Sequence, residues 1–230
     1  MRDYTSTTRG INRESLPFKL YEKAKKFGTW DPKNIDFSKD KEDWESLTNV
    51  IQTIGIEGDL NSYHTAPYRK LFDELLPNTM ERLLHDQSPK AIADAAVVYN
   101  MFAEGVLAET GYWTFYEDLV KINKMPGLLQ GITNIKRDES RHIGFGTFLL
   151  QRLISEDGDM LEYILGKLQE LMPLAVEINQ SASKAEYNPF GVPFADSLAF
   201  MQKQLNARVE VLKRAKGKTL EEVYKIDVVY

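Results

Sequence analysis

The sequence has 230 residues, of which 43% are hydrophobic, and its formal net charge is −5 with acids and bases interspersed. This length can bury one sizeable core, so we expect a single domain over residues 1–230, and the absence of a basic face argues against nucleic-acid binding. Without cysteine, the chain has no disulfides or thiolate ligands, and any metal must be held by oxygen and imidazole nitrogen, a donor set that suits iron and manganese and also zinc.

Residues 1–12 are polar and lack the apolar core of a signal peptide. No apolar run in the sequence approaches the length of a membrane span. We therefore expect a cytoplasmic protein without a membrane-spanning segment.

Between residues 30 and 50 the sequence predicts an extended stretch followed by a short helix. The segment 30–37 is expected to be extended because Pro32 disfavours helix in the residue before it. Ser38 or Asp40 is expected to cap a short helix that contains Trp44.

Apolar residues three and four positions apart predict helices along the rest of the chain, and no alternating strand pattern of any length is found. A cap followed by proline at Ser88–Pro89 marks one helix start, and Pro173 is expected to bend another helix. Residues 226–229 suggest an extended segment near the end of the sequence. The expected helices cover residues 16–27, 67–84, 90–122, 126–155, 159–171 and 194–214. The predicted class is all-α, a bundle of long helices.

The apolar stripe of the helix expected at 126–155 passes through Glu139 and His142. Residues three apart lie one above the other on a helix, and a buried charge is costly unless it is paired, hydrogen-bonded or bound to a metal. Glu-x-x-His on an inward face is the unit that helix bundles use to hold carboxylate-bridged iron or manganese pairs. The alternative is a core histidine satisfied by a nearby acid.

A third candidate ligand, Glu104, lies in the preceding long helix, which is apolar on most sides and so belongs in the interior of a bundle. Two long helices that each place a ligand-type side chain in an apolar face favour a metal site. We therefore predict Glu104, Glu139 and His142 as metal ligands. Glu81 and His85, four residues apart on a polar helix, are expected to form a solvated pair instead.

Three further polar residues each allow two interpretations. Tyr99 is either a core tyrosine or a redox-active or cross-linked phenol near the metals. Asp138 either pairs with Arg141 on the surface or orients a ligand histidine without itself binding the metal. Glu109 is either a second acid that supports the site or part of a salt bridge at the edge of the bundle.

Four segments in combination resemble the small subunit of class I ribonucleotide reductase: WDPKNIDF (30–37), VYNMFAEGVLAETGYWTF (98–115), PGLLQGI (126–132) and DESRHIGFG (138–146). They are most similar to its relatives, the ligand-binding oxidases that hold a manganese/iron pair, and the resemblance covers nearly all of the chain. It implies a ferritin-like helical bundle, a dinuclear Mn/Fe centre with di-iron as the variant, and a homodimer.

The resemblance also implies roles for individual residues. Glu104, Glu139 and His142 match the second half of the dinuclear site, and Tyr99 matches a tyrosine that such oxidases join to a valine by an ether bond.

The family binds a long-chain fatty acid at the metals and reduces dioxygen there. The apolar walls of that ligand pocket would include Phe102, Tyr112 and Phe145.

The sequence departs from the family pattern between Thr48 and Asn49. A bundle site of this kind needs a glutamate from each of two helices and Glu-x-x-His from each of two more, and this sequence has one of each. The family helices that carry the other ligands and the valine have no counterpart here. Four interpretations stay open: one weakly bound metal, a site completed across a dimer, an inactive scaffold, or a natural chain with an additional segment at this junction.

The leading hypothesis is an oxidoreductase of the ligand-binding oxidase type, in which a metal pair activates dioxygen. A radical-generating ribonucleotide reductase subunit and a metal-free, lipid-binding helical bundle are the alternatives. For all of them we expect the side of the bundle that carries Glu104, Glu139 and His142 to be open, or to be covered by another chain.

Overall fold

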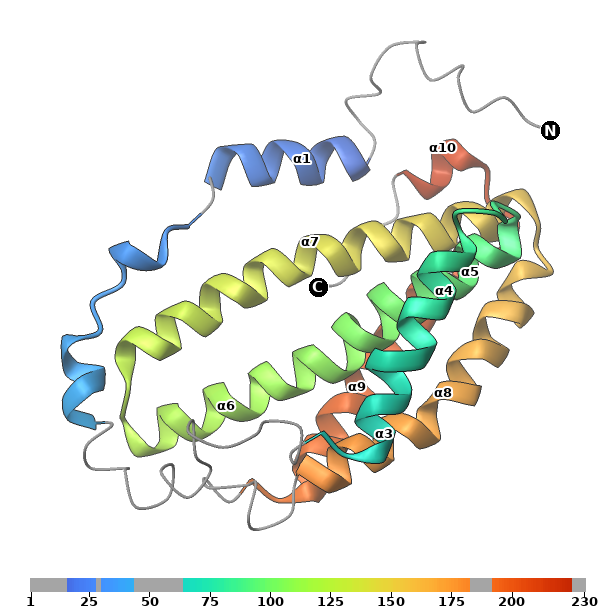
Figure 1. The fold of residues 1–230 in the computed structure, drawn as a ribbon. Helices are drawn as coiled ribbons and strands as arrows, with labels where there is room; N and C mark the ends of the chain where they lie inside the picture. The colour runs from blue at the N-terminus through green and yellow to red at the C-terminus, as the bar shows by residue number, and fades with distance from the viewer. Residues whose placement is uncertain (1–15, 28–29, 44–63, 183–191, 225–230) are drawn as a thin grey trace.

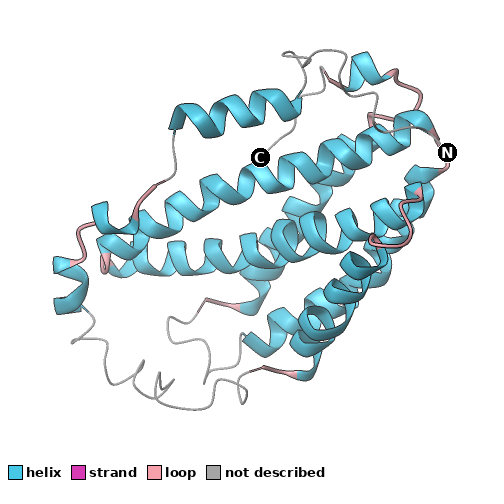
Figure 2. Cartoon of the chain, turned by 45° about the horizontal axis from the view of Figure 1, so that its top comes forward, coloured by secondary structure: helices cyan, strands magenta, loops and turns pink. Residues whose placement is uncertain are grey.

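The computed structural model describes residues 16–27, 30–43, 64–182 and 192–224. All regular elements in these ranges are helical, as Figure 2 shows. The all-α class predicted from the sequence is therefore confirmed. The junction at Thr48 and Asn49 and the extended segment expected at 226–229 lie outside the described residues.

The long helices match the sequence prediction closely, apart from their ends. The elements in chain order are α1 (Leu16–Phe27), η2 (Pro32–Asn34), α3 (Ala66–Arg69), η5 (Lys70–Leu75), α4 (Leu76–Arg82), α5 (Pro89–Ala96), η6 (Val97–Ala108), α6 (Glu109–Ile122), α7 (Pro126–Glu156), α8 (Met160–Ala182), α9 (Phe194–Lys213) and α10 (Leu220–Val223). Helix α8 runs through Pro173 rather than stopping before it. Figure 1 shows α7 lying alongside the continuous helix whose last segment is α6, and α1 lies on the other side of α7.

Two predictions for the N-terminal part are wrong. The stretch expected to be extended contains the 3₁₀ turn η2, because the Asp31 side chain accepts a hydrogen bond from the Lys33 N–H at 2.9 Å and caps the turn. The next helix covers residues 38–43 in the described part of the chain, so Ser38 and Asp40 lie inside it and do not cap it.

Asp40 and Asp43 instead cap a helix far away in the sequence, α7. Asp40 accepts hydrogen bonds from the backbone N–H groups of Gly127 and Leu128 at 2.8 and 2.6 Å, and Asp43 accepts one from Met125 at 2.7 Å. These carboxylates satisfy donors that a helix start leaves unpaired and lie at the positive end of its dipole. They fix where α7 begins.

The helix formed by α5, η6 and α6 (Pro89–Ile122) is the most apolar in the described part of the chain. By length and composition alone it could cross a membrane. However, 72% of its most apolar window is buried within the protein, the position of a core helix. Its middle third, η6, is π-helical. This conformation is rare in proteins overall, but where it occurs it is often at a functional site.

Segment η6 and α7 come into close contact where Gly146 faces Asn100. A Cβ atom built on Gly146 would lie 2.2 Å from the Cβ of Asn100, a distance that real side chains do not tolerate. One residue along α7, the Thr147 hydroxyl donates to the Met101 sulfur at 3.6 Å. The missing side chain at Gly146 therefore sets the spacing of the two helices.

We predict that Gly146→Ala destabilises the protein by about 1–3 kcal/mol, because the added methyl group overpacks the contact with Asn100. Gly166→Ala is the matched control, since a Cβ on Gly166 in α8 would meet nothing within 4 Å and alanine favours helix by roughly 0.5–1 kcal/mol. Urea unfolding measures both. Equal stabilities for the two variants would contradict the close contact.

Candidate metal centre

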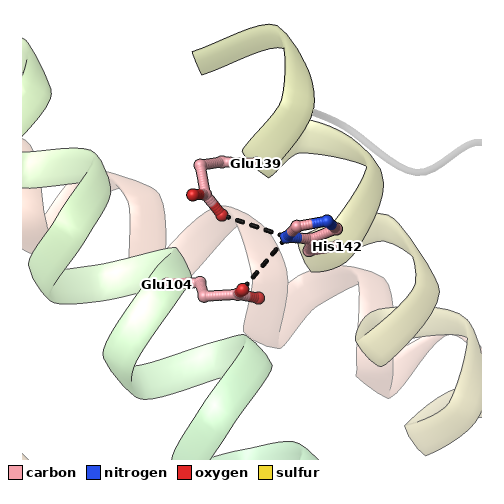
Figure 3. Close-up of side chains that lie close together, drawn as sticks. All are labelled: Glu104, Glu139 and His142. Carbon is pink, nitrogen blue, oxygen red and sulfur yellow. Dashed lines mark hydrogen bonds and ion pairs between the residues drawn. The ribbon is translucent and has the colours of Figure 1, made fainter. Parts of the chain in front are cut away.

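Glu104, Glu139 and His142 converge in the structure as the sequence predicts. Glu104 projects from η6, and Glu139 and His142 project from α7, as Figure 3 shows. The Nδ1 atom of His142 lies 3.1 Å from Oε1 of Glu104 and 3.3 Å from Oε2 of Glu139. One ligand atom from each residue lies within 4.8 Å of the other two, and in the described part of the chain no other group of three acids or histidines does so.

The cluster is buried on one side and open on the other. The side chains of Glu104 and Glu139 are 10% and 21% exposed, whereas that of His142 is 52% exposed. In the described chain, the side that carries the ligands is therefore open, as expected from the sequence.

Two carboxylates close together in a largely buried site carry an electrostatic cost. Burial, and next the charge of Glu104, raises the pKa of Glu139, and the nearby His142 lowers it only in part. Among the described residues the buried Oε2 atom of Glu139 has no hydrogen bond, and its contact with His142 Nδ1 is an ion-pair distance only. Two carboxylates, one of them with an unsatisfied oxygen, and one imidazole nitrogen form a donor set that fits a divalent manganese or iron ion.

Asn100 supports the site and was missed in the sequence analysis. Its side-chain Nδ2 donates to Oε2 of Glu104 at 3.0 Å, and both residues are buried. This bond leaves Oε1 of Glu104 facing His142. The available signal was an amide side chain one turn before Glu104 in an otherwise apolar segment.

Tyr99 lies next to the cluster on the same segment. Hydrogen bonding to Glu104 and burial raise the pKa of Tyr99 to about 12. Its phenol therefore keeps its proton at neutral pH, within reach of a candidate ligand.

Asp138 and Glu109 each take one of the roles considered from the sequence. Asp138 pairs with Arg141 and accepts a hydrogen bond from the Trp30 indole N–H at 2.8 Å. Its partners among the described residues hold α7 to the N-terminal segment. Glu109 forms an ion pair with Arg208 of α9, and Arg208 is almost fully buried.

Two cavities lie beside the cluster, and they separate two of the three residues expected to line one ligand pocket. A cavity of about 360 Å³ is lined by Tyr99, His142 and Phe145 among others, whereas one of about 450 Å³ is lined by Tyr112 and Glu139 among others. Phe102 is fully buried in the core and lines neither. Tyr112 and Phe145 therefore lie on different sides of the cluster.

The fold and this site define a class: a ferritin-like helical bundle with a cluster of two carboxylates and a histidine that could hold a metal ion. Several solved structures are similar to the chain. An R2-like ligand-binding oxidase variant with anaerobically reconstituted Mn/Fe cofactor is 31% identical with a TM-score of 0.77, and the match covers 87% of this chain and 94% of that one. Another variant, with aerobically reconstituted Mn/Fe cofactor, is 29% identical with a TM-score of 0.77 and coverage of 91% and 98%.

An R2-like ligand-binding oxidase without metal cofactor is 31% identical with a TM-score of 0.77, over 87% of this chain and 97% of that one. No protein-family model matches the sequence. The chain belongs to the R2-like ligand-binding oxidases and is an oxidoreductase. The resemblance and the ferritin-like fold expected from the sequence are confirmed.

We predict that Glu139→Gln stabilises the metal-free protein, and that the gain grows as pH rises. The pKa of Glu139 is raised in the folded state, so the stability linked to its proton is fully present below the pKa of the unfolded state, near 4.5, and is lost as pH rises through the folded-state value. The variant has no carboxyl group to ionise and escapes this loss.

Urea unfolding of the metal-free protein between pH 5 and pH 8 measures the difference. Glu162→Gln, an exposed site on α8, controls for the loss of one negative charge. A Glu139→Gln variant whose advantage shrinks with rising pH would contradict the electrostatic cost assigned to this carboxylate.

Proposed function

We propose that this chain is a dioxygen-activating oxidase with a carboxylate-bridged dinuclear Mn/Fe centre, and that it binds a long-chain fatty acid or a similar amphiphile. The observation that carries the metal assignment is the cluster of Glu104, Glu139 and His142, with its donor atoms within 4.8 Å of one another. Support comes from solved relatives whose cofactor is Mn/Fe. A di-iron centre would use the same donors. Cytoplasmic localisation remains our expectation.

In this proposal the bound metal pair supplies the redox chemistry for dioxygen reduction. The residues of this chain provide its charge and geometry. The carboxylates of Glu104 and Glu139 neutralise metal charge, and Nδ1 of His142, which already lies between them, provides the nitrogen donor. Asn100 keeps one oxygen of Glu104 in a hydrogen bond, so the other is free to bind.

Tyr99 is the candidate catalytic side chain near the metals. The influence of Glu104 and burial raise the pKa of Tyr99 to about 12, so its phenol stays protonated at neutral pH. It can therefore hold a hydrogen atom beside the metals at neutral pH.

The cavity of about 450 Å³ is the better place for an amphiphilic ligand. It lies between α6, α7 and α9, and it combines the apolar Ile143 and Phe200 with Tyr112 and the buried cation Arg208. The Nε and Nη1 atoms of Arg208 have no hydrogen bond in the described part of the chain, so an anionic head group would find donors there. Glu139 borders the same cavity, which would place the ligand against the metal centre.

We predict that Glu139→Ala and His142→Ala each abolish metal binding and leave the helices folded, because both remove a donor without removing core packing. Elemental analysis of the purified protein and circular dichroism measure the two effects. Glu81→Ala and His85→Ala are matched controls on α4 and in the turn after it, and both residues are exposed. Unchanged metal content in Glu139→Ala and His142→Ala would refute the assignment.

Extraction and mass spectrometry of bound lipid, on the same samples, separates this proposal from its alternatives. Metal together with an amphiphile supports the oxidase proposed here. Metal without lipid favours a radical-generating ribonucleotide reductase subunit, and lipid without metal favours a lipid-binding bundle.

We further predict that Tyr99 carries no intramolecular ether bond in this chain. The resemblance pairs this tyrosine with a valine that has no counterpart in the sequence. Intact mass and peptide mapping after aerobic metal loading provide the test. A peptide cross-linked at Tyr99 would show that a partner residue exists.

A further inference from the structure

The described residues contain half of the donors that a dinuclear bundle site requires. Such a site takes a glutamate from each of two helices and Glu-x-x-His from each of two others. The described chain brings together one glutamate on η6 and one Glu-x-x-His on α7. The missing half must come from elsewhere.

The open side of the cluster is surrounded by exposed apolar side chains. Phe145, one turn beyond His142 on α7, is 48% exposed and lines the same cavity as His142. Met80 and Tyr99 are also exposed and line the cavity of about 360 Å³ whose wall includes His142. Large exposed apolar patches mark interaction sites in soluble proteins, and here the patch borders the incomplete donor set.

We propose that a second copy of this chain docks on this face and completes the site, so that one dinuclear centre forms across a twofold axis from two copies of Glu104, Glu139 and His142. A twofold interface is isologous, meaning that each copy contributes the same patch and the same donors. Two copies supply two glutamates and two Glu-x-x-His pairs, the complete set. This inference rests on the proposed metal-binding function.

The negative charge of the carboxylates favours a metal-bound dimer over a metal-free dimer. Each chain brings two carboxylates to the axis, so two chains bring four negative charges, which two divalent cations balance. Without the cations, like charges would face each other in a partly buried interface and oppose association. The dimer therefore forms when the metal binds.

The test uses the full chain, freed of metal with a chelator and titrated anaerobically with Mn(II) alone. Sedimentation velocity measures the oligomeric state, elemental analysis the metal content, and electron paramagnetic resonance whether the manganese ions are coupled. We expect a monomer without metal and a dimer with one manganese per chain, whose spectrum is that of a spin-coupled pair.

Met80→Glu tests the apolar face without touching a donor. It should raise the dissociation constant of the metal-loaded dimer at least about tenfold, because it places a charge in the interface. Val120→Glu is the control, since Val120 is about half exposed and lies 16 residues from Glu104, roughly 24 Å along the helix. It should leave the dimer unchanged.

Three results would overturn the inference. A monomer that binds manganese with isolated-ion spectra, or two ions per chain, would leave the metal site in place and show that no second copy completes it. A dimer that forms equally well without metal, or that Met80→Glu does not weaken, would place the interface elsewhere. A chain that binds no manganese would remove the proposed function, and the shared site with it.

Discussion

The close contact between Gly146 and Asn100 is the constraint on which the site depends. The helix formed by α5, η6 and α6 is joined to α7 by a short turn, and the two run antiparallel. The residue one turn after Asn100 in η6 therefore faces the residue one turn before Gly146 in α7. Contact at Asn100 and Gly146 therefore brings Glu104 opposite His142. A side chain at Gly146 would separate the helices at the level of the candidate metal ligands.

The two neighbouring carboxylates of the site destabilise the fold, and other contacts offset this effect. Glu139 lies partly buried beside a second carboxylate, and its raised pKa reflects that environment. The same helix is held at its start by Asp40 and Asp43, which accept three backbone hydrogen bonds. A helix fixed firmly at one end can hold an unfavourable pair of acids near its middle, where a cation would relieve the repulsion.

Much of this could be predicted from the sequence because the relevant signals are local. Helix α1 has the bounds that its apolar spacing indicated, and α7 differs from the prediction by one residue. The three candidate ligands were visible as polar residues in apolar stripes. Each of these signals depends only on residues within a few turns of one another.

The rest depended on contacts between distant segments. Apolar spacing alone did not distinguish the π-helical geometry of η6 from an α-helix, so the orientation of Asn100 toward Glu104 could not be anticipated. Asp40 resembled the cap of its own helix but caps α7, 87 residues away from it at Gly127. The division of Tyr112 and Phe145 between two cavities likewise follows from helix packing.

The central claim is that Glu104, Glu139 and His142 bind metal. A crystal structure of the full chain loaded with manganese and iron, with anomalous scattering recorded at both absorption edges, tests it most directly. We predict anomalous peaks within bonding distance of His142 Nδ1 and of carboxylate oxygens of Glu104 and Glu139. Metal peaks elsewhere, with His142 Nδ1 still in contact with the oxygens of Glu104 and Glu139, would contradict it.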